Sequence, residues 1–162
     1  MKRIDILERI GTFPALLARV VADVPETLWR TRPADGSFAL VEHIWHLGDL
    51  EREGFGERID VIARERNYID LPMALAFVAF EEARATNIAS LSPLTATSWK
   101  RSGTQEHVGA VTVSSVLESI LAHDIAHANE IAGLLMELEL PLSDELTALA
   151  ALGAGASSAP AA

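Results

Sequence analysis

Apolar residues recur with a helical period in four segments of the chain. In the first, residues 4–21, they fall at steps of three and four and so share one face of a helix. Pro14 lies inside this segment, and proline lacks an amide hydrogen and clashes with the preceding turn. The pattern therefore predicts either a helix kinked at Pro14 or one that begins slightly later.

The second and third segments carry the same pattern and have recognisable starts. After a connection that contains Pro and Gly, Ser37 is suited to cap a helix whose apolar stripe continues to Ile62 and into the mid-sixties. Pro72 suits the first turn of a third helix, which ends before Ser92. Residues 95–109 are polar and lack a period, so we expect them to be irregular.

The fourth segment offers a choice between strand and helix. Val111 to Val113 has strand propensity, but no neighbouring segment alternates with period two to pair with it. We therefore predict that a helix starts at Thr112 or Ser114 and continues through Leu138. Pro141 stops it, because proline cannot continue a helix.

Four long helices joined by modest loops predict an all-α fold, a four-helix bundle. A chain of 162 residues suffices for one such domain, which we assign to residues 1–145, with a short C-terminal extension. Residues 146–162 are rich in Ala, Gly and Ser and are expected to be loosely ordered. A short fifth helix after Ser143 is the alternative for the beginning of this extension.

Composition narrows the class of function. Thirteen Lys and Arg against 23 Asp and Glu give a net charge of −10, which repels nucleic-acid phosphates and anionic lipid heads. Neither nucleic acid nor a membrane is therefore expected as a partner. No apolar run is long enough to span a bilayer and no unbroken signal core is present, so we expect a cytoplasmic protein. The chain has no Cys, so any metal ligands must be His and carboxylates.

Four of the five histidines occur as two close pairs, His43 with His46 and His123 with His127. Residues four apart lie one above the other on a helix, so His123 and His127 can direct two imidazoles at one metal ion. A facing helix must supply a third ligand, and we prefer His46. His43 is expected to face solvent or to support a ligand. Three imidazoles leave one position open, as in catalytic zinc sites.

Other interpretations of these histidines remain. A pair at this spacing also arises in ordinary helices, where imidazoles are solvated or hydrogen-bonded in the core. The His123–His127 segment also has the spacing of the zincin His-Glu-x-x-His motif, with Asp124 in place of the general base. That interpretation is weak, because Asp is one methylene shorter and no strands of a zincin cleft are predicted. Spacing alone leaves a metal site and an ordinary pair about equally supported.

Two motifs resemble those of the DinB-like superfamily. The segment 32–51, which contains His46-Leu-Gly-Asp-Leu-Glu, is similar to the second-helix motif of that family. Gly109-Ala-Val-Thr-Val, followed by His123-Asp-Ile-Ala-His127, is similar to the lead into its last metal-binding helix. The resemblance covers most of the predicted bundle. It implies a DinB-like fold that holds one divalent metal ion through His46, His123 and His127.

Three acidic residues lie near these histidines in the sequence. Glu130 stands where many relatives have Gln, and it could serve as a fourth ligand or as a base behind the ligands. Asp49 and Asp124 could orient an imidazole or hold a proton. For these two, an ordinary solvated carboxylate is the slightly preferred interpretation.

The resemblance implies a metal-dependent enzyme that activates water or a small-molecule thiol, that is, a hydrolase or a thiol S-transferase. A non-catalytic metal-binding or stress-response helical protein is the alternative. Imidazoles do not distinguish metals of similar affinity, and we expect zinc or nickel. The expected partners are a small-molecule substrate, with a low-molecular-weight thiol as one candidate, and a second copy of the chain in a homodimer.

Overall fold

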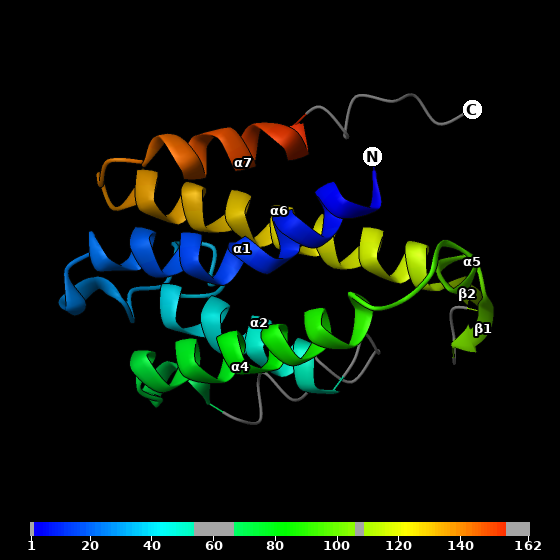
Figure 1. Ribbon diagram of the computed structural model, residues 1–162. Coiled ribbons are helices and arrows are strands. Elements are labelled where there is room, and N and C mark those ends of the chain that lie inside the picture. The colour runs from blue at the N-terminus through cyan, green and yellow to red at the C-terminus, as the bar shows by residue number, and fades with distance from the viewer. Residues whose placement is uncertain (1, 54–66, 106–108, 155–162) are drawn as a thin grey trace.

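The computed structural model describes residues 2–53, 67–105 and 109–154. Within these ranges four long helices lie alongside one another and form a bundle (Figure 1). Their bounds are α1 Arg3–Ala22, α2 Leu40–Glu53, α4 Met73–Leu91 and α6 Val113–Glu137. The predicted all-α four-helix bundle is therefore confirmed. The predicted course of the second helix beyond residue 53 lies outside the described residues.

The apolar faces of these helices meet in the middle of the bundle, as their period predicts. The larger core cluster joins all four long helices, and a second cluster fills the end near the start of α6. Fully buried members of the larger cluster include Leu17, Val41, Ile44, Phe80, Ile131 and Leu135. Gly48 allows α2 to approach α4 closely, because a Cβ there would lie 3.3 Å from the backbone nitrogen of Phe80.

One of the two predicted starts of α1 agrees with the structure, whereas the predicted start of α2 does not. Helix α1 begins at Arg3 and continues through Pro14, so the alternative of a later start is wrong. Helix α2 begins at Leu40, not after a Ser37 cap, because the Ser37 hydroxyl donates to Asp35. The Glu42 carboxylate accepts the hydrogen bond from the Ala39 amide, at 2.8 Å, and so takes over part of the capping role.

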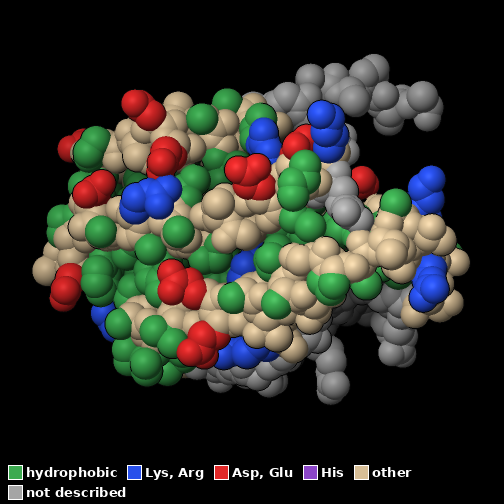
Figure 2. All heavy atoms as spheres, in the orientation of Figure 1, with side chains coloured by type: hydrophobic (Ala, Val, Ile, Leu, Met, Phe, Trp, Pro, Cys, Tyr) green, Lys and Arg blue, Asp and Glu red, His purple; other side chains and the backbone are tan. Residues whose placement is uncertain are grey.

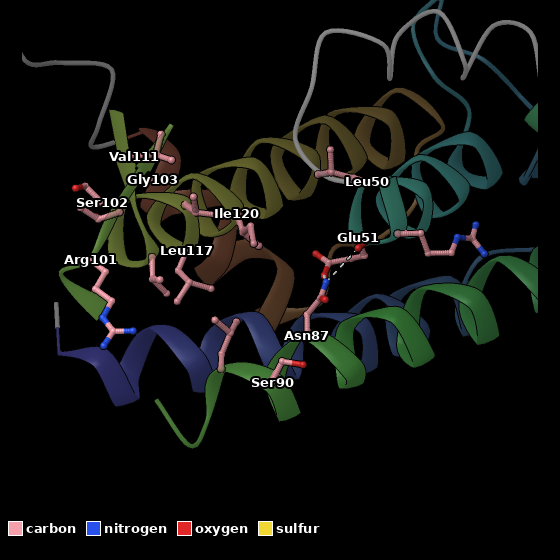
Figure 3. A pocket seen from close by; sticks show the side chains of 15 residues that line it. Leu50, Glu51, Asn87, Ser90, Arg101, Ser102, Gly103, Val111, Leu117 and Ile120 are labelled. Carbon is pink, nitrogen blue, oxygen red and sulfur yellow. Dashed lines mark hydrogen bonds between the residues drawn. The ribbon is translucent and has the colours of Figure 1, made fainter. Parts of the chain in front are cut away.

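We expected the connection between α4 and α6 to be irregular, but it contains regular secondary structure. It contains the one-turn helix α5, Ala96–Trp99, and a hairpin of β1, Ser102–Gln105, with β2, Gly109–Thr112. The strands are antiparallel and pair Ser102 with Thr112, at the end of the bundle where α6 begins (Figure 3). The prediction that no strand forms near Val111 is therefore wrong. The partner strand β1 could not be recognised in the sequence, because it lacks a period-two pattern. The predicted helix start at Thr112 is confirmed, since its side chain accepts from the Ser115 amide at 3.1 Å.

The last described element, α7, Asp144–Ala154, packs along α6 (Figure 1). Leu146 is fully buried, so the expectation of loose order does not hold for residues 146–154. The short helix after Ser143 is the alternative that describes them. The remainder of the predicted extension, residues 155–162, lies outside the described residues.

The surface agrees with the acidic composition. Acidic side chains are spread over the face formed by α7, α1 and α4 (Figure 2). Two short 3₁₀ helices, η1 at Glu26–Leu28 and η2 at Tyr68–Asp70, complete the described elements. Among all these helices none combines the length and the apolar character needed to cross a membrane.

Candidate metal centre

Helices α2 and α6 bring three histidines together. His46 comes from α2, and His123 and His127 come from α6, one turn apart. One ring nitrogen from each lies within 4.8 Å of the others. The ring centroids of His123 and His127 are 4.4 Å apart, and that of His46 is 4.9 Å from His127. The structure thus brings together the three residues that the sequence singled out.

The spacing of the ring nitrogens fits a tetrahedral metal ion. Two nitrogens bound at 2.0–2.1 Å with tetrahedral angles are about 3.3 Å apart. Nε2 of His123 and Nε2 of His127 are 3.2 Å apart. Imidazole nitrogens are ligands that zinc, nickel and copper accept. The three histidines, which we call the triad, therefore suit a divalent transition-metal ion.

His127 presents its two ring nitrogens to different groups. Nε2 faces His123, whereas Nδ1 is 2.8 Å from Oε2 of Glu130 and 3.0 Å from Nδ1 of His43. This geometry favours the tautomer in which Nδ1–H donates to Glu130 and leaves the Nε2 lone pair within the triad. The hydrogen bond from His127 lowers the pKa of Glu130, which keeps its carboxylate ionised. Of the two predicted roles of Glu130, support of a ligand is the one that this contact favours.

His43 is buried, so of the two positions expected for it the one that faces solvent is wrong, and support of a ligand is the alternative that remains. It is only 2% exposed, and it forms a second potential ligand group with His127 and Glu130. Burial, with His127 nearby, lowers the pKa of His43 to about 3. The ring of Phe38 meets both His43 and His46 edge-on, at centroid distances of 5.5 and 5.4 Å. These contacts hold the two α2 imidazoles between an aromatic ring and α6.

His123 of the triad is also kept uncharged. Burial is the main reason that the pKa of His123 falls to about 3, and the neighbouring His127 and His46 lower it further. A neutral imidazole has one nitrogen lone pair available for a metal ion, whereas an imidazolium has none. His123 is therefore in its ligand form at neutral pH.

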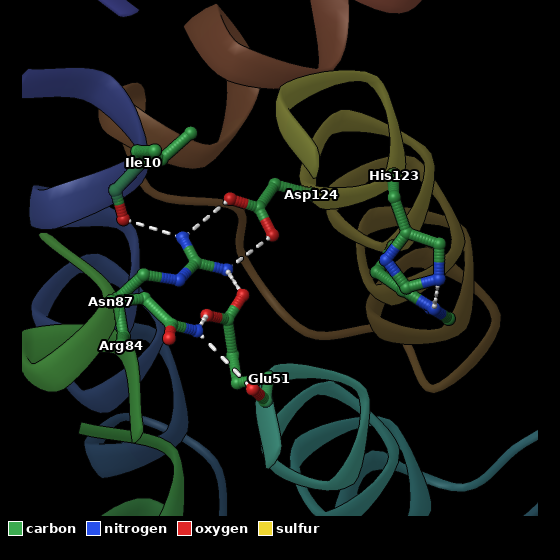
Figure 4. A network of polar contacts seen from close by, with 7 residues as sticks. Ile10, Glu51, Arg84, Asn87, His123 and Asp124 are labelled. Carbon is green, nitrogen blue, oxygen red and sulfur yellow. Dashed lines mark hydrogen bonds and ion pairs between the residues drawn. The ribbon is translucent and has the colours of Figure 1, made fainter. Parts of the chain in front are cut away.

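Asp49 and Asp124 are buried, not solvated as preferred from the sequence. Asp49 accepts a hydrogen bond from the Tyr68 hydroxyl and pairs with Arg52. Asp124 receives two hydrogen bonds from the Arg84 guanidinium, at 2.8 and 2.9 Å. Figure 4 shows that Asp124 and His123 point to different sides of α6. The hydrogen bonds that Asp124 accepts from Arg84 thus join α6 to α4.

Arg84 is the centre of a buried polar network that sequence reasoning missed. It also pairs with Glu51 at 2.9 Å and donates to the Ile10 carbonyl oxygen at 2.5 Å (Figure 4). Burial opposes its charge, but Asp124 and Glu51 together raise the pKa of Arg84. Burial raises the pKa of Asp124 to about 6. The sequence held one signal of this network, because Arg84 is a charged residue on a face of the helix that is otherwise apolar.

The triad borders a pocket of about 510 Å³. The pocket is lined by Arg32, Gly36, Ser37, Phe38, Glu42, His43, His46, Asn67, His123, Ala126, His127 and Glu130. Arg32 is held there by Glu42, which accepts from Nε at 2.9 Å and from Nη2 at 2.5 Å. A small molecule entering this pocket would meet the imidazoles, one guanidinium and the Glu130 carboxylate.

Comparisons with known proteins place this architecture in a family. None of the curated proteins matches the chain. Among solved structures, YfiT from Bacillus subtilis, described as a probable metal-dependent hydrolase with an unusual four-helix bundle topology, is similar with a TM-score of 0.77. The two share 14% sequence identity over 87% of this chain and 91% of YfiT. The family model of the DinB superfamily matches residues 10–131. The chain therefore belongs to the DinB superfamily, with the four-helix bundle fold that the two motifs implied.

Proposed function

We propose that this protein is a metal-dependent hydrolase that holds one zinc or nickel ion in the triad of His46, His123 and His127. The observation that carries the proposal is the meeting of three ring nitrogens within 4.8 Å at the wall of a 510 Å³ pocket. The description of YfiT as a probable metal-dependent hydrolase supports the same class of reaction. An accessible pocket favours an enzyme over a closed structural site.

The ion would supply Lewis acidity that brings the pKa of a water molecule toward neutrality. The protein's own residues prepare the site for it. Glu130 accepts the Nδ1 proton of His127 and so keeps Nε2 available. Phe38 and His43 pack against the ligands and restrict rotation of their rings.

Arg32 gives the pocket a fixed positive group. Its ion pair with Glu42 holds the guanidinium at the wall, where it can attract a polar or anionic part of a substrate. In the reaction, the oxygen of water, with one of its hydrogens, bonds to the carbonyl carbon of an ester or amide. The bond from that carbon to the leaving oxygen or nitrogen breaks, and the leaving group takes up the other hydrogen of the water as a proton. The products are an acid and an alcohol or amine.

Metal content measured by plasma mass spectrometry is the first test. Untagged wild-type protein and a triple variant, His46→Ala with His123→Ala and His127→Ala, are equilibrated with zinc or nickel and then desalted. We expect the wild type to retain about one equivalent and the variant to retain almost none, because no ligand of the triad remains.

Asn129→Ala is the matched control, since Asn129 is exposed on the same helix. It should retain metal like the wild type. Equal metal content in the wild type and the triple variant would remove the site. Metal retained by the wild type without ester or amide hydrolysis would leave a metal-binding protein and reject the hydrolase.

A further inference from the structure

A second pocket, of about 750 Å³, lies beside the triad pocket and has no part in the proposed metal site. It is enclosed by the C-terminal ends of α2 and α4, the first half of α6 and the β1–β2 hairpin (Figure 3). Its apolar walls are Leu50, Leu91, Val113, Val116, Leu117 and Ile120. We call it the apolar pocket.

Helix geometry places the apolar pocket in line with the triad. On α2, Leu50 follows His46 by four residues, and on α6, Ile120 precedes His123 by three. Residues three or four apart lie on one face of a helix, with Cβ atoms about 5–6 Å apart. The same faces of α2 and α6 therefore line both pockets, one helical turn apart.

Of the charged residues that line the apolar pocket, Arg52 is paired with Asp49, and Glu51 is paired as well. Glu51 pairs with Arg84 at 2.9 Å and accepts a hydrogen bond from Asn87 at 2.6 Å. Its side chain is only 1% exposed. A ligand would thus find an apolar interior, with polar side chains such as Ser102 and Arg101 exposed at the hairpin. This chemistry suits a hydrocarbon group, because burying a polar group without a partner is unfavourable.

We propose that the apolar pocket binds the acyl chain of the substrate, whose ester or amide carbonyl lies at the triad. This inference rests on the proposed hydrolase function and names its substrate class. The pocket extends along α6 from Val113 to Ile120, which is about 10 Å at 1.5 Å per residue. Ile120 lies three residues, about 4.5 Å, from His123, so an extended chain of roughly eight carbon atoms, about 9 Å long, whose carbonyl lies at the triad would enter the pocket and end near Leu117.

Hydrolysis of 4-nitrophenyl esters from acetate to octanoate tests the chain-length dependence. Water and ester give the carboxylic acid and 4-nitrophenol, and the rate found with the triple histidine variant is subtracted. We expect kcat/KM to rise about fourfold for each methylene group buried, up to roughly the octanoate.

Val116→Trp fills the apolar pocket and should lower kcat/KM for the octanoate by more than about tenfold while leaving the acetate unchanged. Val78→Trp makes the same change at a residue that is 50% exposed on α4 and outside this pocket, and should have no effect. If circular dichroism shows that Val116→Trp is unfolded, Leu91→Phe replaces it.

Calorimetric binding of octanoate separates this inference from the hydrolase proposal. In a chelator, octanoate should bind the wild type and the triple histidine variant alike, and Val116→Trp should abolish binding. Octanoate binding without any hydrolysis would support the apolar pocket and reject the hydrolase. Hydrolysis that is independent of chain length, or octanoate binding that Val116→Trp does not change, would overturn the inference.

Discussion

His127 joins the triad to the residues behind it. Its Nε2 is 3.2 Å from His123, and its Nδ1 is 2.8 Å from Glu130 and 3.0 Å from His43. A single imidazole can donate at one nitrogen and bind a metal at the other, which is how carboxylate–histidine pairs support metal sites. The orientation of one ring thus decides which atom is available as a ligand.

The buried imidazoles predict that the metal-free protein is sensitive to acid. The pKa of His43 falls from 6.5 to about 3 on folding. As the pH is lowered, this imidazole is therefore protonated in the unfolded chain before it is protonated in the folded protein. The contribution of the neutral His43 imidazole to the free energy of unfolding is complete above pH 6.5. It is lost as the pH falls toward 3, at roughly 1.4 kcal/mol per pH unit. In a chelator, His43→Gln should therefore lose less stability than the wild type between pH 7 and pH 5. Urea unfolding at both pH values measures this.

Asp124 makes the comparison with a variant necessary. Its pKa rises from 3.8 to about 6, so its own contribution has the opposite sign and favours folding as the pH falls from 6 to 3.8. Both proteins share that contribution, and it cancels in the difference. Identical pH dependence in wild type and His43→Gln would contradict a neutral buried imidazole.

At the scale of elements, α6 carries the site on one side and a structural anchor on another. His123 belongs to the triad, and the next residue, Asp124, is held by Arg84 from α4. Arg84 also donates to a carbonyl oxygen of α1 and pairs with Glu51 of α2. These contacts join all four long helices and set the rotation of α6, and therefore the direction in which its histidines point.

Breaking this anchor should be costly. Asp124→Leu leaves the Arg84 guanidinium buried with a single carboxylate, and we expect the free energy of unfolding to fall by about 3 kcal/mol. Adding Arg84→Met should lower it by less than Arg84→Met does alone, because only the pair with Glu51 is then left to break. Urea denaturation provides the values.

The exposed Arg19–Glu145 pair is the control for that experiment. The two side chains are 59% and 54% exposed, and Arg19→Ala should change stability by less than about 1 kcal/mol. An Asp124→Leu variant no less stable than Arg19→Ala would show that the buried network does not hold the helices.

At the scale of the whole molecule, an ion in the triad would link α2 to α6. A ligand that binds only the folded state stabilises it by about 2.7 kcal/mol when present at 100 times its dissociation constant. For a chain of this size that corresponds to a rise in Tm of roughly 5–10 °C. Zinc should therefore raise the Tm of the wild type but not that of the triple histidine variant, as scanning calorimetry can measure. An equal rise in both proteins would place the bound zinc elsewhere.

The sequence by itself determined the long helices and three of the residues that meet between them. Apolar periodicity depends on one element at a time, so α1, α4 and α6 could be predicted, and Thr112 was recognisable as the start of α6. The spacing of His123 and His127 depends only on helical pitch. The choice of His46 over His43 was supported by the family resemblance.

The tertiary structure decided what lies across each helix. Arg84 meets Asp124 from a position 40 residues earlier in the chain, and His43 meets His127 from 84 residues away. No local pattern reveals such partners, so Asp49 and Asp124 are expected in solvent, and His43 in solvent or in support of a ligand, although all three are buried. The β1–β2 hairpin and the burial of Leu146 likewise depend on pairing and packing between segments. Local periodicity specifies which face of a helix is apolar, whereas the burial of a polar group depends on partners that only the folded chain brings close.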